Sequence, residues 1–503
     1  MFISLKTRRN RYRKMNAEIE HLIQLEKALG TNYVEQSLGY QPVDNSYNLT
    51  ETEFLVLRML VSNGQALIQQ HLYNGTSPTE LESLLCSYLD AALEKLPRED
   101  TTETVFRVTS NNTITVQDIG KEKVIPAYLT TSKKWLITND NCVYVIRLAG
   151  RTKAKSIYKA YEVIPLMPEE QVEFPRNTKF FVADVCNKEG KTVVELWEQP
   201  DNPWPAEKLT NNVTAFFQNI NTIDIQDAVN KGLNPNIHLM RSMNGKSINS
   251  LCTEKGNVYI SPVFAQALWN LCYAGLWLSD YRIISEEFAE KGYTLDVVCA
   301  DIDKANCVEP ECLYLKAIQG AYKWEDMLLQ TVFLLTDQYN KNDDIFLGSI
   351  NTEGELEKRV NGLFQTGMGC ILLHELMHYY GDHFARLASE NRRDLEQEAD
   401  DKAFDAILAL EGNIRKSAIL GGMASYLLLF YMNPKLVVND EYYREDERLF
   451  AQYDKIVDKR RASIFVANVL TEWLKRYHNI NVEVKHGQEE ETVEEIRSIL
   501  RGI

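Results

Sequence analysis

The feature that most constrains this 503-residue chain is a pair of histidines four residues apart, in the segment ILLHELMHYYGDH. An offset of four residues turns an α-helix about 40° past one full turn, so His374 and His378 leave the same face. The apolar residues MGCILL that precede them favour a helix that is buried along its length. The pattern predicts a long helix over residues 360–383 that holds two imidazoles side by side.

Two imidazoles in this arrangement suit a zinc ion, which binds histidine nitrogen at about 2.0–2.1 Å. Glu375 follows the first histidine and borders the same face. There it would take a proton from a water that the zinc activates and pass it to the leaving amine. We therefore predict zinc as the cofactor, His374 and His378 as metal ligands, and Glu375 as the catalytic general base.

A third protein ligand is needed, and two residues compete for that place. His383 follows His378 by five residues. Glu396 lies in a second predicted helix over residues 394–410, and Asp400 shares its face four residues later. Asp400 would then accept the ring N–H of a ligand histidine and fix its tautomer. We favour Glu396 as the third ligand and keep His383 as the alternative.

The sequence HELMH followed by EQEAD and KAFDAIL resembles the gluzincin zinc metallopeptidases. The pattern is similar to that of the ImmA/IrrE-like, the phage-exclusion (Lit-like) and the CAAX-prenyl-type peptidases, over roughly residues 340–435. The resemblance implies a zincin-type domain that hydrolyses a peptide bond in a protein substrate. It also implies zinc ligation by His374, His378 and Glu396, a base at Glu375, support from Asp400, and a role in bacterial or phage conflict. The donor that stabilises the oxyanion stays open among Tyr426, Tyr442, Tyr443 and His478.

The arrangement of elements along the chain predicts an α+β protein. Leucine and isoleucine recur at helical spacing before residue 100, and short β-rich runs separated by turn residues follow up to residue 200. The rest is mainly helical, with one expected strand at residues 293–300. The predicted parts are a helical arm (1–45), a mixed domain with a small sheet (46–200), a zinc metallopeptidase domain (210–435) and a helical extension (436–503).

The β-rich region has a weaker resemblance to the ADP-ribosyltransferase toxins. Its elements are an arginine in the strand VFRVT, hydroxyl residues in AYLTTSKKW, and the acidic turn of EEQVEFPRNTKFFV. The resemblance implies a degenerate transferase-like domain with a site for an NAD-like nucleotide, in which the arginine would bind phosphate. The residues that would form this site are Arg107, Thr130, Thr131, Ser132, Glu169 and Gln171. The alternative function is therefore a transferase-like effector or partner-binding protein whose zinc site is structural.

Charge and composition exclude several other classes. The net charge of −16 disfavours nucleic acid as the main partner, although residues 6–14 are basic. The longest apolar run, residues 418–432, is too short for a membrane span and predicts a buried helix. The N-terminal residues lack the order of a secretory signal, and the nine cysteines show no disulfide framework. We therefore expect a cytoplasmic protein with no membrane contact.

Overall fold

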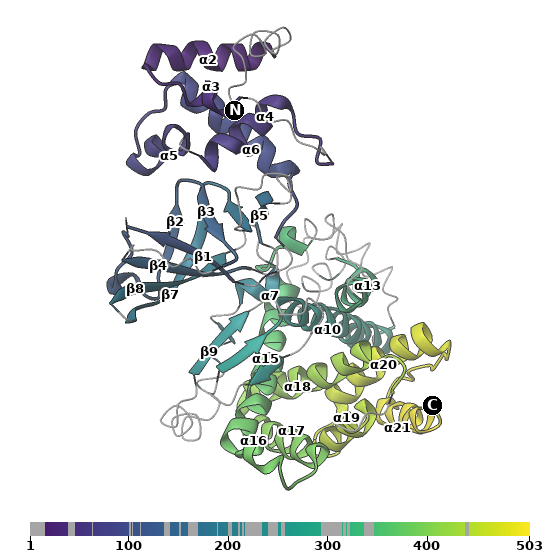
Figure 1. The fold of residues 1–503 in the computed structure, drawn as a ribbon. Helices are drawn as coiled ribbons and strands as arrows, with labels where there is room; N and C mark the ends of the chain where they lie inside the picture. The colour runs from purple at the N-terminus through teal and green to yellow at the C-terminus, as the bar shows by residue number, and fades with distance from the viewer. Residues whose placement is uncertain are drawn as a thin grey trace. The chain divides into compact units, whose positions relative to one another are not determined.

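The computed structural model divides the chain into two compact units, Met1–Asp201 and Asn202–Ile503 (Figure 1). Each unit is considered by itself below. The described residues are 16–38, 46–62, 64–99, 102, 104–110, 112–134, 141–149, 152–158, 170–188, 190–199, 204–209, 212–213, 216, 234–239, 250–252, 257–292, 314, 318, 322–336, 347–437 and 442–503.

The first unit begins with helices that bury their apolar faces against one another. Two of them start at a threonine whose hydroxyl accepts from the backbone N–H three residues later, while the glutamate there accepts from the threonine N–H. These capping boxes, Thr50 with Glu53 and Thr79 with Glu82, satisfy donors that a helix start leaves unpaired. The helices are α2 (Ala17–Leu29), α3 (Tyr33–Ser37), α4 (Glu51–Leu60), α5 (Gln65–Asn74) and α6 (Glu80–Lys95).

An eight-stranded sheet follows, with strand order β2-β7-β8-β4-β1-β3-β6-β5. Only the β4–β8 pair is parallel among the strand pairs of this described sheet. Its core includes Phe174 and Phe180, whose rings pack edge to face at 5.2 Å. The strands are β1 (Thr104–Thr109), β2 (Glu122–Ile125), β3 (Leu129–Ser132), β4 (Cys142–Arg147), β5 (Lys155–Ser156), β6 (Gln171–Phe174), β7 (Thr178–Lys188) and β8 (Lys191–Gln199), with a short 3₁₀ helix, η2 (Val116–Asp118), between β1 and β2.

The second unit is mainly helical and has one continuous apolar core. A small sheet of order β10-β11-β9 precedes the long helices. Residues of the three C-terminal helices, such as Leu449, Trp473 and Ile496, belong to the same core as the helices before them. The elements are α7 (Pro205–Lys208), β9 (Asn234–Leu239), β10 (Ser250–Cys252), β11 (Asn257–Ile260), α10 (Pro262–Glu290), α13 (Trp324–Leu335), α15 (Glu355–Tyr380), α16 (His383–Arg386), α17 (Arg392–Leu408), α18 (Gly412–Met432), α19 (Glu445–Tyr453), α20 (Arg460–His478) and α21 (Glu489–Arg501).

Close contact between α15 and α18 fixes the frame of the second unit. A β-carbon on Gly421 would lie 2.3 Å from Thr366 Oγ1 and 2.6 Å from the backbone nitrogen of Gly367, so only glycine permits this approach. Thr366 Oγ1 also donates to the backbone oxygen of Ser417 at 3.0 Å, which links the two helices by a hydrogen bond. Helix α17 packs against α15 as well, and it also contacts α18. Residues on α15, α17 and α18 are therefore held in fixed register.

The prediction of an α+β protein, with a small mixed sheet followed by a helical region, is confirmed. The two long helices predicted around residues 360–383 and 394–410 correspond to α15 and α17, and the buried helix expected at residues 418–432 is the end of α18. The expected strand at residues 293–300 lies outside the described residues. The four-part domain division stays a prediction.

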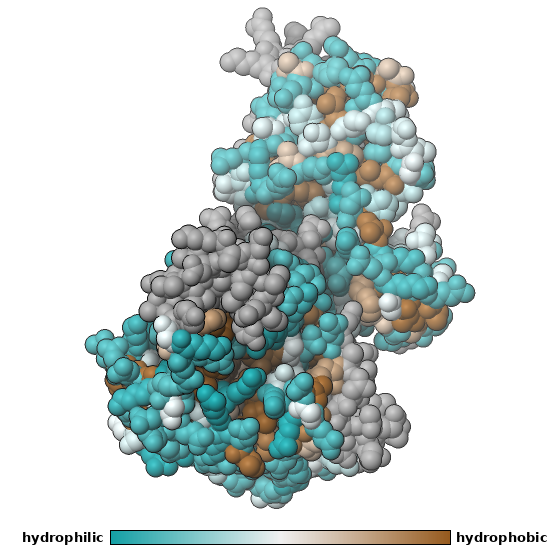
Figure 2. Space-filling model, turned by 180° about the vertical axis from the view of Figure 1, so that it is seen from behind, coloured by the Kyte–Doolittle hydropathy of each residue, from teal (hydrophilic) through white to brown (hydrophobic). Residues whose placement is uncertain are grey.

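No helix in the described part of the chain is both long enough and apolar enough to cross a membrane. The face of the molecule seen in Figure 2 is largely hydrophilic, with small hydrophobic patches between polar side chains.

Candidate metal centre

Helix α15 presents His374 and His378 on one face, as their spacing predicts. Their Nε2 atoms are 3.0 Å apart, and the two rings meet edge to face. Glu396 on α17 completes the group, because its Oε2 lies 3.3 Å from His374 Nε2 and 3.4 Å from His378 Nε2. Three potential ligand atoms from two packed helices thus converge on one point.

The spacing of these three atoms fits a zinc ion. Two ligands at about 2.05 Å from zinc, separated by the tetrahedral angle, are roughly 3.3 Å apart. The three separations of 3.0–3.4 Å cluster around that value. Two histidines and one carboxylate also match the donor set of catalytic zinc sites. The residues present therefore fit the predicted metal.

Asp400 and Arg448 orient the first histidine from behind. Asp400 Oδ1 lies 2.9 Å from His374 Nδ1, and the other ring nitrogen, Nε2, faces Glu396. When His374 binds a metal through Nε2, Asp400 is placed to accept the proton on Nδ1. Arg448 of α19 donates to both oxygens of Asp400, at 2.7 Å and 2.9 Å. Burial would raise the pKa of Asp400, but Arg448 and His374 outweigh it and lower the pKa to about 2. Asp400 is therefore a charged, fully paired carboxylate.

The two carboxylates also change the basicity of His374. Burial lowers its pKa, while the hydrogen bonds with Asp400 and Glu396 raise the pKa to about 10. The same contacts with His374 and His378 lower the pKa of Glu396 well below its usual range, against the effect of burial. The centre thus concentrates negative charge around two imidazoles, which favours a bound cation.

His383, the alternative third ligand, lies on the far side of His378. Its Nδ1 is 2.9 Å from His378 Nδ1, the ring nitrogen that faces away from His374 and Glu396. Burial first, and then His378, lower the pKa of His383 to about 4, so its ring is neutral. In this geometry His383 supports His378 and does not join the converging set.

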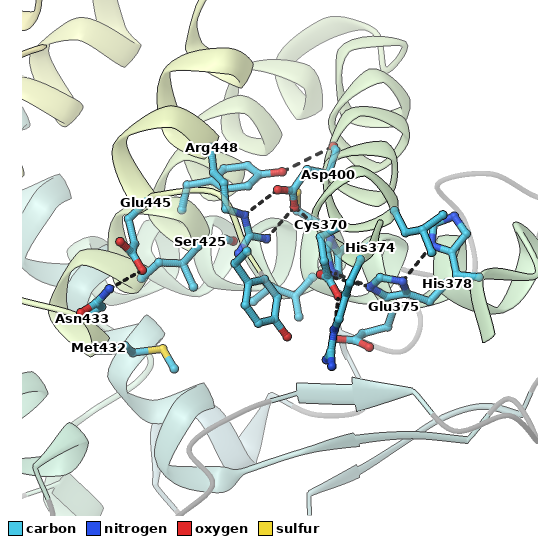
Figure 3. A pocket seen from close by; sticks show the side chains of 18 of the residues that line it. Cys370, His374, Glu375, His378, Asp400, Ser425, Met432, Asn433, Glu445 and Arg448 are labelled. Atoms are coloured by element: carbon cyan, nitrogen blue, oxygen red, sulfur yellow. Dashed lines mark hydrogen bonds and ion pairs between the residues drawn. The ribbon is translucent and has the colours of Figure 1, made fainter. Parts of the chain in front are cut away.

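A cavity of about 730 Å³ opens in front of the centre. Glu375 is buried and lines this cavity together with both histidines. Figure 3 shows Glu375 beside His374, with Asp400 and Arg448 behind them and Met432, Asn433 and Glu445 at the other end of the cavity. The cavity is lined by Phe264, Cys370, Ile371, His374, Glu375, His378, His383, Phe384, Leu387, Arg392, Leu395, Glu396, Asp400, Ser425, Tyr426, Leu429, Met432, Asn433, Val437, Tyr442, Glu445 and Arg448.

The four candidate oxyanion donors lie in different surroundings. The Tyr443 hydroxyl donates to Asp394 at 2.9 Å, and the His478 ring contacts the backbone oxygen of Pro434 at 3.1 Å. Neither residue lines the cavity. Tyr426 does so but is buried, with its hydroxyl 3.5 Å from the backbone oxygen of Asp400.

Tyr442 is the remaining candidate, and it lies on the cavity wall near the metal centre. Its ring packs under two guanidinium groups, those of Arg392 at 5.7 Å and Arg448 at 5.5 Å. Burial first, and then the Glu396 carboxylate, raise the pKa of its hydroxyl, which is therefore protonated at neutral pH.

Sequence reasoning missed Arg448 altogether. It lies 48 residues after Asp400, in the charged run EYYREDER, and nothing in that run distinguishes it from surface arginines. Its partner in space is set by the packing of α19 against α17 and α18. Glu445 and Tyr442 enter the cavity from the same part of the chain.

A second group of metal-ligating residue types, Glu286, His486 and Glu489, lies at the start of α21. Arg282 already donates to Glu286 at 2.8 Å, and the His486 side chain is 49% exposed. These contacts form an ordinary ion-pair network between α10 and α21, and nothing in their geometry requires a metal.

The predicted nucleotide-site residues lie on neighbouring strands of the first unit. Arg107 of β1 donates to the backbone oxygen of Thr130 at 3.2 Å, and Thr131 donates through its hydroxyl to the backbone oxygen of Val172 at 2.7 Å. Ser132 pairs with Gln171 in the β3–β6 register. Glu169 lies outside the described residues.

Glu173 is the carboxylate that faces these strands, and the sequence offers it, like Glu170, in place of Gln171 only if the register of the turn shifts. It pairs with Thr130 in the register and is fully buried. Neither of its oxygens has a hydrogen-bond partner in the part of the chain that the structure describes. Burial is the main cause that raises its pKa to about 8, and the opposing influence of Thr130 and Arg107 is smaller. The alternating pattern of QVEF, with Gln171 and Glu173 on one face, is the sequence signal that points to it.

Residues 258–468 match the family model of Peptidase U49. The matched region contains α15, α17, α18 and α19, and with them every residue of the converging set. The C-terminal region is thus similar to a family of peptidases. No curated protein matches the chain.

Several solved structures resemble part of the chain at low similarity. Exoenzyme S from Pseudomonas aeruginosa, in complex with human 14-3-3 protein beta and bound to Carba-NAD, is 16% identical, with 36% of this chain and 89% of that chain covered and a TM-score of 0.29. The C3 exoenzyme of Clostridium limosum is 15% identical, with 31% and 88% covered and a TM-score of 0.24. The type III effector XopAI from Xanthomonas axonopodis pv. citri is 17% identical, with 39% and 75% covered and a TM-score of 0.28. Scores at this level assign neither a fold nor a function.

Proposed function

We propose that the protein is a zinc-dependent endopeptidase that hydrolyses a peptide bond in a protein substrate. The observation that carries the proposal is the convergence of His374 Nε2, His378 Nε2 and Glu396 Oε2 within 3.4 Å of one another, at the mouth of a cavity. The match of the surrounding region to a peptidase family supports it. Three protein ligands, with a position left for water or substrate, are typical of a catalytic zinc site.

In this proposal, different side chains of the site have different roles in hydrolysis. A zinc ion held by the three ligands supplies a Lewis acid that lowers the pKa of water and polarises the substrate carbonyl. Glu375, buried next to His374 on the cavity wall, accepts the proton of the attacking water and transfers it to the leaving amine. Tyr442 donates its hydroxyl hydrogen to the oxyanion that develops on the carbonyl oxygen.

The surrounding polar groups hold the ligands in place. Asp400, fixed by two hydrogen bonds from Arg448, keeps the Nε2 lone pair of His374 pointing at the metal position. His383 contacts the other ring nitrogen of His378 at 2.9 Å. Both ligand imidazoles are therefore oriented before a metal arrives, which reduces the entropy lost on binding.

The rim of the cavity fits a polypeptide substrate. Leu387 is 44% exposed and Val437 is 60% exposed, and both line the cavity. We propose that an extended segment of a protein substrate lies across this rim with its scissile carbonyl at the metal centre.

The test is the search for new N-termini in a bacterial cell lysate after incubation with zinc-loaded protein, by amine labelling and mass spectrometry. Wild-type protein should generate a defined set of cleavages that Glu375→Gln does not generate while it keeps its zinc. Tyr442→Phe should slow the same cleavages by about 10²–10³-fold, as the loss of one oxyanion donor does. Tyr443→Phe is the matched control and should cleave like wild type. Equal cleavage by wild type and Glu375→Gln would contradict the assignment of the base.

A second candidate function rests on the first unit. Arg107, Thr130 and Glu173 bring a cation, a hydroxyl and an unpaired carboxylate together, and an NAD-like nucleotide could bind beside them. In that case the protein is a transferase-like effector or a partner-binding protein, and the zinc is structural. Saturable binding of NAD by calorimetry, lost in Arg107→Ala, together with absence of any cleavage, would favour this candidate. A role in bacterial or phage conflict is proposed from the sequence resemblance alone, and a cytoplasmic place of action is proposed from the composition and cysteine pattern of the chain.

A further inference from the structure

The end of the cavity opposite His378 is built around a carboxylate that has an unused oxygen. Glu445, the first residue of α19, accepts a hydrogen bond from Asn433 Nδ2 through Oε1 at 2.9 Å. Its second oxygen, Oε2, is buried and has no hydrogen-bond partner among the residues that the structure describes. Figure 3 shows Glu445, Asn433 and Met432 together, apart from the histidines of the metal centre. A buried carboxylate oxygen without a partner is costly, and a cation bound beside it would offset that cost.

The position of Glu445 is fixed by the loop that follows α18. Asn433 also donates to the backbone oxygen of Val437 at 3.1 Å and accepts from the Val437 N–H at 3.2 Å. Asn433 thus ties the loop to the start of α19, and the free oxygen of Glu445 is held in place by this link. The arrangement is rigid enough to act as a recognition site.

Among the described residues of the lining, Glu445 makes no ion-pair contact, although the charge of Arg448 acts on it from a distance. Four acidic residues line the cavity, namely Glu375, Glu396, Asp400 and Glu445. Arg448 neutralises Asp400 through two hydrogen bonds, and Glu396 and Glu375 adjoin the metal position. Arg392, the other cationic residue of the lining, lies 3.9 Å from Glu396. Burial raises the pKa of Glu445, and a cation brought beside it would lower that pKa again.

The wall next to Glu445 is apolar. Leu429 and Met432 project from the last turn of α18, and Val437 and Phe264 line the same cavity. An apolar wall with one carboxylate suits a side chain that has a hydrocarbon stem and a cationic end, because the stem packs while the charge pairs. Lysine and arginine are the two amino acids with that structure.

We infer that this end of the cavity is a specificity subsite, which accepts a lysine or arginine side chain of the substrate and pairs its cation with Glu445. The inference rests on the proposed peptidase function and adds the class of substrate to it. The preferred substrate segment then carries a basic residue close to the scissile bond. Acidic side chains at that place are rejected, since they would meet Glu445 in a poorly solvated cavity.

The test uses small hydroxamates, which bind zinc directly and require no knowledge of the natural substrate. Two series of dipeptide hydroxamates carry lysine, norleucine or glutamate on one side or the other of the zinc-binding group. Their affinities are measured by calorimetry for zinc-loaded wild type, Glu445→Gln and Glu495→Gln. Glutamine keeps the size of Glu445 and an oxygen for Asn433, and Glu495 is an exposed glutamate of α21 outside the cavity.

In one of the two series, wild type should bind the lysine compound about 10–100-fold more tightly than the norleucine compound, as expected for a charged hydrogen bond. Glu445→Gln should lose that preference and Glu495→Gln should keep it. Equal affinity for lysine and norleucine in both series, or a preference that survives in Glu445→Gln, would overturn the subsite while the metal centre stands. Failure of every compound to bind zinc-loaded protein would overturn the metal centre, and the subsite with it.

Discussion

Asp400 and Glu173 are both buried carboxylates, but their surroundings are opposite. Asp400 is 2% exposed, accepts two hydrogen bonds from Arg448 and lies 2.9 Å from His374 Nδ1, and these contacts hold its pKa at about 2. Glu173 is 0% exposed, neither of its oxygens has a hydrogen-bond partner among the described residues, and burial raises its pKa to about 8. At neutral pH the first is charged and the second is protonated.

The difference shows that hydrogen-bond and ion-pair partners decide whether a buried carboxylate is ionised. Burial alone disfavours the ionised form, whereas an arginine and a histidine in contact reverse that preference. The second unit therefore maintains a negative charge at Asp400, behind His374. The first unit keeps its carboxylate neutral until a cation or a rise in pH changes it.

The largest expected effect comes from removal of the paired carboxylate. Asp400→Ala leaves Arg448 buried without its partner, which should lower the free energy of unfolding of the zinc-free protein by about 3–5 kcal/mol. Zinc affinity should fall by about 10–100-fold as well. Urea denaturation and zinc titration measure the two effects. The control, Asp405→Ala, removes an exposed partner of Lys455 and should cost under about 1 kcal/mol. Equal stability of the two variants would show that Asp400 is not the paired charge described here.

Glu173→Gln should raise the free energy of unfolding instead of lowering it, and the size of this gain should depend on pH. Because its pKa is raised from 4.5 to about 8, Glu173 contributes stability that is fully present below pH 4.5 and lost as pH rises through 8. The glutamine variant lacks this loss and should gain, relative to wild type, on the order of 3 kcal/mol by pH 9. Unfolding curves between pH 5 and pH 9 measure it, with exposed Glu122→Gln as the control. Parallel pH dependence in wild type and Glu173→Gln would contradict a neutral Glu173.

A smaller effect tests the scaffold that keeps Asp400 and the histidines in register. Gly421→Ala places a methyl group against Thr366 and Gly367 and should destabilise the second unit by about 1–3 kcal/mol. Gly362→Ala, in α15 with open space at its β-carbon, should instead stabilise by about 0.5–1 kcal/mol. Thermal unfolding distinguishes the two. A gain of stability in Gly421→Ala would mean that α15 and α18 do not meet as closely as described.

The sequence predicted which side chains converge on α15 and α17 better than it predicted the neighbours in the sheet, because the constraints on the two helices are local. The spacing of His374 and His378 places both imidazoles on one helix face, and the spacing of Glu396 and Asp400 does the same on the next helix. Helical periodicity is enough for both. Arg448 could not be found this way, since its contact with Asp400 depends on how a helix 48 residues later packs.

In the sheet, the alternation of residues does not determine which side chains become neighbours across strands. Gln171 and Glu173 share a face of β6, and only strand pairing decides which neighbours each one meets. The pairing puts Glu173 opposite Thr130 and Gln171 opposite Ser132. Register of this kind depends on contacts between distant segments, which composition and alternation do not specify.

The central claim is that His374, His378 and Glu396 hold one zinc ion, and metal content tests it most directly. Purified wild type, Glu396→Ala and His383→Ala are loaded with zinc, dialysed and analysed by mass spectrometry for bound metal. We expect one equivalent in wild type and in His383→Ala, and none in Glu396→Ala. If zinc is retained in Glu396→Ala but lost in His383→Ala, the third ligand is His383 and not Glu396. If wild type binds no zinc, the metal centre itself is contradicted.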